Sequence, residues 1–282
     1  MRPTAASLRG LDALVFDIQD VGARFYTYQT TMFYCMEEAA KAHVPFYVLD
    51  RPNPITGTHV EGPLLDPGLR SNNVGHFAGL PVRHGMTIGE LARMFNAETS
   101  AGADLTVIPL EDWHRGDWFD ATGLVWINPS PNMRSLNAAT LYPGLALLEY
   151  SKGYSVGRGT DAPFEQVGAS FIGGRELSAH LNEREIAGVR VYPTMVGKVE
   201  GVRFVITNRE LFDATRLGLE VAAAIQKLYP GKLDFSVDGK LIGSEGVVRR
   251  LMAGEDPRSI QQSLADQVDR FVKKRAAYLL YR

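Results

Sequence analysis

Hydrophobic and polar positions alternate in a way that predicts strands and helices in turn along the first half of the chain. Almost continuously apolar runs at residues 11–17, 45–50, 104–110 and 124–128 predict buried parallel strands. Apolar residues at helical spacing predict a helix over residues 30–43. Thr87 and Glu90 have capping-box spacing and predict the start of a second helix, and Pro143 suits the first turn of a third. The pattern indicates an α/β fold built from βαβ units.

The pattern changes beyond residue 160, where two strand-like stretches accompany three long helical patterns. The strands are expected at residues 189–192 and 202–207. Thr207 and Glu210 repeat the capping-box spacing and are expected to open the first helix. The other two helices are expected at residues 244–252 and from Asp256 onward. We therefore predict two domains, residues 1–160 with the parallel sheet and residues 161–282 as a smaller α+β domain.

A long loop rich in proline and glycine is expected at residues 51–73, and its length indicates that it carries function or is mobile.

Composition excludes several functional classes. The 282 residues carry 30 basic and 32 acidic side chains without a long run of either sign, so nucleic acid is not an expected partner. The single Cys35 excludes a disulfide framework, and the six histidines lack ligand spacing, so neither a metal nor another cofactor is expected. No apolar stretch is long enough to span a membrane, and residues 1–10 lack the apolar core of a signal peptide.

Three polar clusters follow three of the predicted strands. They are residues 17–20 with Arg24, residues 50–53 and residues 128–132. Turn chemistry would explain any one of them, because Asn, Asp, Pro and Gly are common turn residues. The carboxyl ends of parallel strands converge in space, however, and open α/β sheets bind ligands there. Together the clusters predict a ligand site.

Several single residues admit two interpretations. A haloacid dehalogenase-like phosphatase would need a second aspartate where Gln19 stands, which makes that function improbable. Glu61 lies in a loop stiffened by Gly and Pro, which suits a catalytic carboxylate and equally a solvated one. His84 would lie near the positive end of the helix that Thr87 opens. The Gly-flanked Arg158 could bind a ligand carboxylate or pair with Glu165.

Seven segments, in order and spacing, resemble the bacterial exo-β-N-acetylmuramidase family called NamZ-like. They are residues 15–28 (VFDIQDVGARFYTY), 51–54 (RPNP), 60–63 (VEGP), 83–87 (RHGMT), 129–133 (PSPNM), 155–160 (SVGRGT) and 163–165 (PFE). Members release N-acetylmuramic acid from the non-reducing ends of peptidoglycan fragments. The resemblance implies a Rossmann-like domain joined to a smaller auxiliary domain, with the sugar held between them.

The resemblance, combined with glycosidase chemistry, implies roles for ten residues. Cleavage needs a proton donor and a second carboxylate. The candidates are Asp17, Asp20, Glu61 and Glu165. The lactyl carboxylate of muramic acid calls for a cation, supplied by Arg24 or Arg158. Hydroxyl and acetamido groups would be bound by Tyr26, Asn53, His84 and Asn132.

Family members are usually exported and usually carry a further N-terminal segment, with a candidate catalytic glutamate, that this sequence does not contain. The resemblance therefore implies an unpaired sheet edge, which favours association into a homodimer, and low muramidase activity. Two rival functions remain open. One is a non-catalytic protein that binds cell-wall glycans, and the other is a hydrolase or transferase acting on another acidic sugar or a phosphorylated metabolite.

Overall fold

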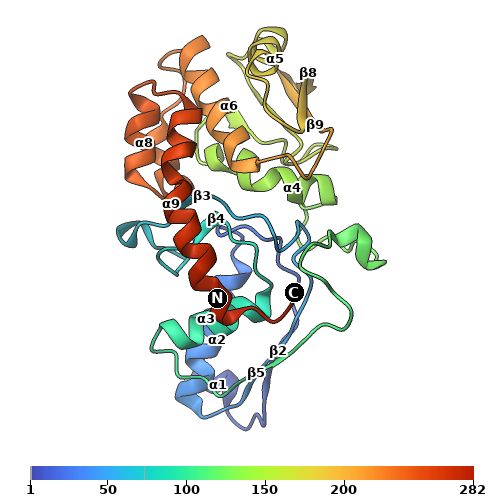
Figure 1. Ribbon diagram of the computed structural model, residues 1–282, viewed down its shortest axis with the longest axis vertical. Helices are drawn as coiled ribbons and strands as arrows, with labels where there is room; N and C mark the ends of the chain where they lie inside the picture. The colour runs from blue at the N-terminus through green and yellow to red at the C-terminus, as the bar shows by residue number, and fades with distance from the viewer. Residues whose placement is uncertain (1, 73) are drawn as a thin grey trace.

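The computed structural model describes residues 2–72 and 74–282, and the chain forms two parts stacked along the long axis (Figure 1). The N-terminal part holds a parallel sheet in the order β1-β2-β5, followed in space by a short antiparallel pair, β3-β4. Its strands are β1 (Leu14–Phe16), β2 (Phe46–Leu49), β5 (Leu105–Ile108), β3 (Glu61–Leu64) and β4 (Pro81–Arg83). Its helices are α1 (Ala5–Leu8), α2 (Tyr28–Ala42) and α3 (Ile88–Glu98), with 3-10 turns at Pro67–Leu69 and Phe119–Thr122.

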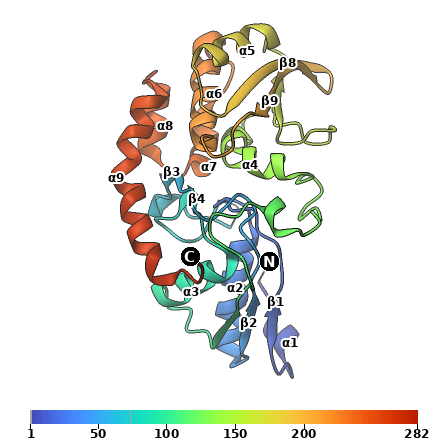
Figure 2. The ribbon, with the colours of Figure 1, turned by 45° about the vertical axis from the view of Figure 1, so that its right-hand side comes forward.

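The C-terminal part is built on an antiparallel sheet in the order β6-β7-β9-β8. Its strands are β6 (Tyr154–Ser155), β7 (Gln166–Ala169), β8 (Val189–Val196) and β9 (Val199–Ile206). Its helices are α4 (Leu136–Leu145), α5 (Gly174–Glu183), α6 (Ala214–Leu228), α7 (Gly239–Ile242), α8 (Glu245–Met252) and α9 (Pro257–Arg275), with 3-10 turns at Ala146–Leu148, Phe235–Asp238 and Ala276–Tyr278. Helix α9 runs beside both parts and returns the C-terminus to the N-terminal part (Figure 2). The predicted α/β class with a separate α+β part is confirmed.

The parallel sheet buries one face and exposes the other. Phe16, Val48 and Val107 lie side by side in the register and pack, with their neighbours, against α2 and α3. Side chains alternate between the faces of a strand, so Val15 points to the opposite face, where Leu49 and Ile108 also lie. Val15 is 54% exposed. Parallel sheets are normally covered on both faces, so the exposure of these apolar side chains is unusual for a parallel sheet.

The helix that Thr87 opens is confirmed, and its capping box is complete. The Thr87 hydroxyl accepts from the Glu90 amide, and the Glu90 carboxylate accepts from the Thr87 amide. Helices α8 and α9 also begin where predicted, capped by Ser244 and Asp256.

Three predictions of local structure are wrong. Residues 124–128 form no strand, because no neighbouring strand pairs with them, and Val125 is 82% exposed. Helix α4 begins at Leu136 because the Ser135 side chain caps it, so Pro143 lies inside the helix rather than in its first turn. Helix α6 begins at Ala214, where Asp213 provides the cap, and not at Thr207.

The predicted loop at residues 51–73 contains β3, which pairs with β4, and its last residue, Asn73, lies outside the described residues.

Helices α4 and α6 cross at two glycines. A Cβ atom on Gly144 would lie 1.9 Å from the Ala214 carbonyl oxygen, and one on Gly218 would lie 2.4 Å from the Gly144 carbonyl oxygen. Both contacts are with backbone atoms, which cannot rotate away. The crossing therefore requires glycine at both positions.

We predict that Gly144→Ala lowers the free energy of unfolding by about 1–3 kcal/mol, because the added methyl group forces the two helix backbones apart. The matched control is Gly246→Ala in α8, where a Cβ would meet only the Ser244 Oγ at 3.7 Å. Alanine there is expected to leave stability unchanged or to raise it by up to about 1 kcal/mol. Urea denaturation followed by tryptophan fluorescence measures both, and equal effects of the two changes would contradict the close-contact argument.

Candidate active site

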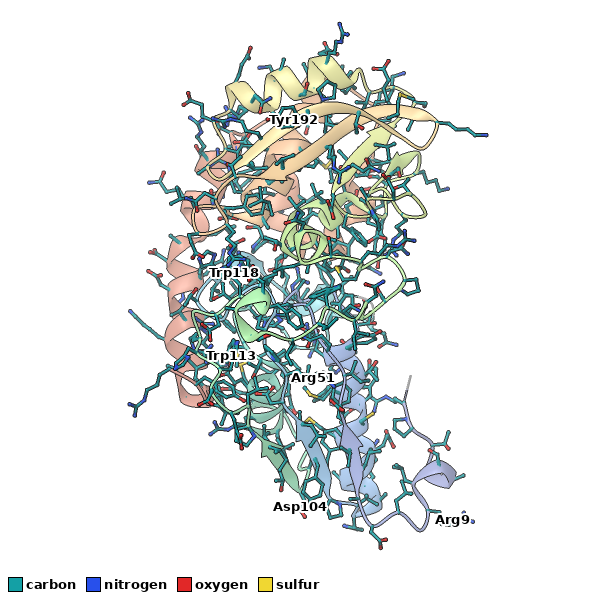
Figure 3. The ribbon with its side chains drawn as sticks, turned by 90° about the vertical axis from the view of Figure 1, so that its right-hand side faces the viewer. Arg9, Arg51, Asp104, Trp113, Trp118 and Tyr192 are labelled. Carbon is teal, nitrogen blue, oxygen red and sulfur yellow. The ribbon has the colours of Figure 1, made fainter. Side chains whose placement is uncertain are left out.

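The carboxyl ends of the parallel strands face the C-terminal part. Arg51, two residues after the end of β2, lies midway along the molecule, whereas Asp104, just before β5, lies at the far end (Figure 3). Residues that follow β1 and β2 are therefore directed toward the junction of the two parts. Ligands of open α/β sheets bind at this edge.

A cavity of about 340 Å³ lies at this junction and is lined by side chains from both parts of the chain. This volume lies within the range of about 300–1,000 Å³ that is usual for small-molecule sites. Its lining includes four tyrosines, an acid and a base, namely Tyr26, Tyr28, Tyr142, Tyr150, Glu149 and Arg158. We refer to it below as the tyrosine pocket.

The tyrosines of this pocket pack edge to face. The ring centroids of Tyr26 and Tyr28 are 4.9 Å apart, and those of Tyr26 and Tyr142 are 5.8 Å apart. The buried hydroxyl of Tyr26 makes no hydrogen bond of normal geometry in the described part of the chain, although Ser130 and Tyr28 lie near enough to act on its pKa. Buried tyrosine hydroxyls usually have a partner, and these two hydroxyls are the neighbours of Tyr26 in the pocket wall.

Arg158 lies at the rim of the tyrosine pocket. Its Nε donates to a Glu149 carboxylate oxygen, and its guanidinium carbon lies 4.8 Å from the centre of the Phe164 ring. The loop that carries it turns at Gly157 and Gly159, whose φ angles of +77° and +78° are readily adopted only by glycine. The alternative prediction, an Arg158–Glu165 ion pair, is wrong: Glu149 takes that place.

Asp20 and His84 form a buried polar pair close to this pocket. The His84 Nδ1 accepts from the Met86 amide at 3.2 Å, which places the ring proton of a neutral imidazole on Nε2. That Nε2 lies 3.7 Å from the Asp20 Oδ2, too far for a hydrogen bond. The Asp20 Oδ2 accepts from the Gly22 amide at 2.8 Å, while its Oδ1 has no partner among the described residues.

Burial sets the protonation of this pair. It raises the pKa of Asp20 to about 7, with the Gly22 amide opposing the shift. It lowers the pKa of His84 to about 3, helped by nearby arginines. The charge of Asp20 also contributes to raising the pKa of Tyr26 and of Tyr142, although Asp20 itself does not line the tyrosine pocket. Near neutral pH, His84 is therefore neutral and Asp20 exchanges its proton easily.

The other three candidate carboxylates hold partners elsewhere. Asp17 is exposed and pairs with Arg51 at 2.6 Å. The Glu61 carboxylate is buried between Arg83 and the Ala214 amide at the start of α6, where it joins the two parts of the chain. Glu61 therefore makes a buried contact between the parts instead of lining the tyrosine pocket.

Glu165 accepts from the Ser135 hydroxyl at 2.6 Å and pairs with Arg203 at 3.2 Å. It thereby ties the cap of α4 to β9. A catalytic role for Asp17, Glu61 or Glu165 stays a prediction.

Three of the candidate ligand-binding residues use their side chains for hydrogen bonds to backbone groups of the protein. Arg24 is fully buried and donates to the carbonyl oxygens of Val74, Leu241 and Ile242. Asn53 is buried and donates to the Met86 carbonyl. The Asn132 side chain accepts from the Gly159 amide at 3.2 Å and so supports the loop that carries Arg158.

Sequence reasoning did not assign roles to three contributors to this site, Glu149, Tyr142 and Phe164. Tyr142 and Phe164 are aromatic side chains in segments that also build the core, so their spacing in the sequence does not distinguish a site residue from a core residue. The tertiary contact with Arg158 alone distinguishes Glu149 from other acids that follow a helix.

A second cavity, of about 640 Å³, lies among α5, α6, α8 and α9, and none of the ten candidate residues lines it. Within residues 2–72 and 74–282, no helix has the length and apolar character needed to cross a membrane, and no cluster of three His, Cys, Asp or Glu side chains suits a metal ion.

Both halves of the chain match models of one protein family. Residues 1–137 match the N-terminal model of exo-β-N-acetylmuramidase NamZ, and residues 140–281 match its C-terminal model. The chain is 42% identical over 295 aligned residues to the peptidoglycan β-N-acetylmuramidase NamZ of Bacillus subtilis (strain 168). The alignment covers 99% of this chain and 70% of that protein.

Two solved structures of DUF1343 family proteins from Bacteroides fragilis have the same fold. One aligns with a TM-score of 0.92 and 31% identity over 100% of this chain and 78% of the other. The second aligns with a TM-score of 0.77 and 30% identity over 100% of this chain and 79% of the other.

We predict that Asp20→Asn makes the protein more stable than the wild type at pH 8, by on the order of 4 kcal/mol, and that this gain shrinks toward pH 4. The folded pKa is about 7 and the unfolded value about 3.8. Between these values the folded state holds a proton that the unfolded chain has released, so stability falls as pH rises. Below the lower value both states are protonated and the penalty vanishes.

Urea denaturation at several pH values measures this difference, because the other titrating groups are the same in both proteins. A difference that does not change with pH would show that Asp20 keeps an ordinary pKa in the folded protein.

Proposed function

The chain belongs to the exo-β-N-acetylmuramidase NamZ family, and we propose that it hydrolyses the glycosidic bond of a terminal N-acetylmuramic acid residue in peptidoglycan fragments, with the sugar bound in the tyrosine pocket. The family supports glycosidase activity on a peptidoglycan-derived substrate. The position of the sugar in the tyrosine pocket is supported by the residues that line this pocket. A peptidoglycan substrate fits a periplasmic or extracellular place of action, which we propose as well.

The chemistry of muramic acid fits this pocket. The sugar has apolar ring faces, hydroxyl groups and one carboxylate on its lactyl ether. Tyr26, Tyr142 and Tyr150 offer aromatic surface with polar tips. Arg158 offers the cation for the carboxylate at the rim of the same cavity.

Asp20 is the proton donor in this proposal. When the bond between the sugar carbon and the leaving oxygen breaks, the Asp20 carboxyl transfers its proton to that oxygen. Water adds to the sugar carbon and its proton passes to the solvent, from which the Asp20 carboxyl is protonated again, so the products are N-acetylmuramic acid and the shortened fragment. Asp17, Glu61 and Glu165 do not line this pocket, so in this proposal water adds without a second carboxylate from these candidates. A pKa of about 7 suits a group that must give and regain a proton near neutral pH.

One observation carries the assignment of Asp20. Of the four candidate carboxylates, it is the buried one with an oxygen atom that no described residue occupies. Asp17, Glu61 and Glu165 each face a cation. The neutral His84 lies beside Asp20, with its Nε2 at 3.7 Å from the Asp20 Oδ2.

The test is incubation of the protein with a muramyl-glucosamine disaccharide and detection of free N-acetylmuramic acid by mass spectrometry. We expect the wild type to release it and Asp20→Asn to lose at least about 10² in kcat, because the amide cannot donate a carboxyl proton. Binding of N-acetylmuramic acid, measured by calorimetry, should survive in the variant.

Binding of the sugar without any hydrolysis by the wild type would instead favour a non-catalytic glycan-binding protein. Hydrolysis retained by Asp20→Asn would remove this residue from the reaction.

We also propose that the chain forms a homodimer through the edge of β1. Within the described residues, β1 pairs only with β2, and its outer edge and the exposed Val15 are free. Two copies related by a two-fold axis would pair β1 with β1 in antiparallel fashion, which continues the sheet across both copies and brings the two Val15 side chains near each other on one face.

We predict a dimer mass in light scattering and a monomer mass for Val15→Lys, because the two lysines would bring like charges together across the β1–β1 pair. Val125→Lys makes the same change at a side chain that is 82% exposed and lies outside the parallel sheet, and it should leave the dimer intact. A wild-type monomer at micromolar concentration would contradict the proposal.

A further inference from the structure

We propose that Glu149 is a positioning residue that sets the sugar specificity of the tyrosine pocket, by holding Arg158 so that one edge of its guanidinium faces the ligand carboxylate. This inference rests on the proposed function, because it concerns how that pocket recognises muramic acid. The observation that carries it is the way in which Arg158 is held.

Arg158 is held on one edge and on one face. A guanidinium has five N–H donors in a rigid plane. The Nε donor of Arg158 is bound by Glu149, and the ring of Phe164 lies against the plane at 4.8 Å. In the described part of the chain, the two terminal nitrogens Nη1 and Nη2 donate to no protein group. These two nitrogens form an edge that can donate two parallel hydrogen bonds to a carboxylate.

Both groups that hold Arg158 are themselves fixed. Phe164 is 2% exposed and packs edge to face on Tyr142, with 4.7 Å between ring centroids. Glu149 is followed by Tyr150 and Ser151, which donate to the two carboxylate oxygens of the fully buried Asp238.

Without these contacts, Arg158 would be a mobile side chain. It lies on an exposed loop between two glycines, and its side chain is 49% exposed. Glu149 is only 18% exposed, so it anchors the arginine to the packed core. An ordered guanidinium loses less conformational entropy when a ligand binds than a mobile one does. Arg158 is therefore preorganised for a carboxylate.

If Glu149 competed with the ligand instead of positioning Arg158, its removal would change the affinity in the opposite direction. If its carboxylate occupied Arg158 as a competitor of the ligand carboxylate, removing it would strengthen the binding of acidic sugars. The geometry argues against competition, because Glu149 contacts Nε and leaves the Nη1–Nη2 edge open. The two roles are separated by the direction of the change in affinity.

The experiment compares calorimetric binding of N-acetylmuramic acid and N-acetylglucosamine, which differ by the lactyl group, to Glu149→Ala and the wild type. We expect the affinity for N-acetylmuramic acid to fall about tenfold in Glu149→Ala while that for N-acetylglucosamine stays unchanged. Glu149→Gln keeps an oxygen acceptor for Nε and should recover part of the loss. Arg158→Lys should lose the preference for the acidic sugar, because a lysine has no planar fork.

Glu255→Ala is the matched control, since Glu255 also pairs with an arginine, Arg250, and lines the other cavity. It should leave both affinities unchanged. Equal or tighter binding of N-acetylmuramic acid by Glu149→Ala, or a parallel loss for both sugars, would overturn the positioning role while the proposed function stands. A wild type that does not prefer N-acetylmuramic acid would instead overturn the proposed function, and this inference with it.

Discussion

Four buried arginines dominate the interior of this protein, and their need for partners constrains the loops around them. Removing a guanidinium from water is costly unless carbonyl or carboxylate oxygens replace the water. Arg83 is bound by Glu61 and Arg115 by Glu90, while Arg24 and Arg275 are bound by backbone carbonyls. Because these partners come from segments far apart in sequence, satisfying the charges also joins the two parts of the chain.

The same network explains why the loop after β4 is rigid. Arg275, in the last turn of α9, donates to the carbonyls of Gly57, His84 and Gly85, and Arg115 donates to Gly57 and Gly85 from another direction. The backbone of His84 is therefore fixed by charges that belong to the scaffold. Its imidazole faces Asp20, whose Oδ2 lies 3.7 Å from the His84 Nε2. Burial shifts the pKa of both groups strongly, and strongly shifted pKa values are common at functional sites.

Burial also divides the arginines by role. From the sequence alone, Arg24 and Arg158 are equally suitable to bind a ligand carboxylate, and both lie in motifs that resemble the family. Arg24 is enclosed, and its terminal nitrogens serve protein carbonyls. Arg158 is supported from one edge and one face and keeps its other edge open at a cavity. The first stabilises the junction of the two parts, and the second is suited to bind a ligand there.

The sequence by itself determined the strands β1, β2 and β5, the starts of α3, α8 and α9, and the α/β class, because local periodicity and caps act over a few residues. The order of the motifs indicates the family, and Asp20, His84, Tyr26 and Arg158 remain predicted site residues. Local patterns could not show that residues 124–128 lack a pairing strand, or that Ser135 and Asp213 cap α4 and α6. Nor could they show that Glu149 holds Arg158 while Glu61 and Arg24 are enclosed. Only the tertiary structure decided these, because strand pairing, desolvation and charge pairing depend on which distant segments lie together.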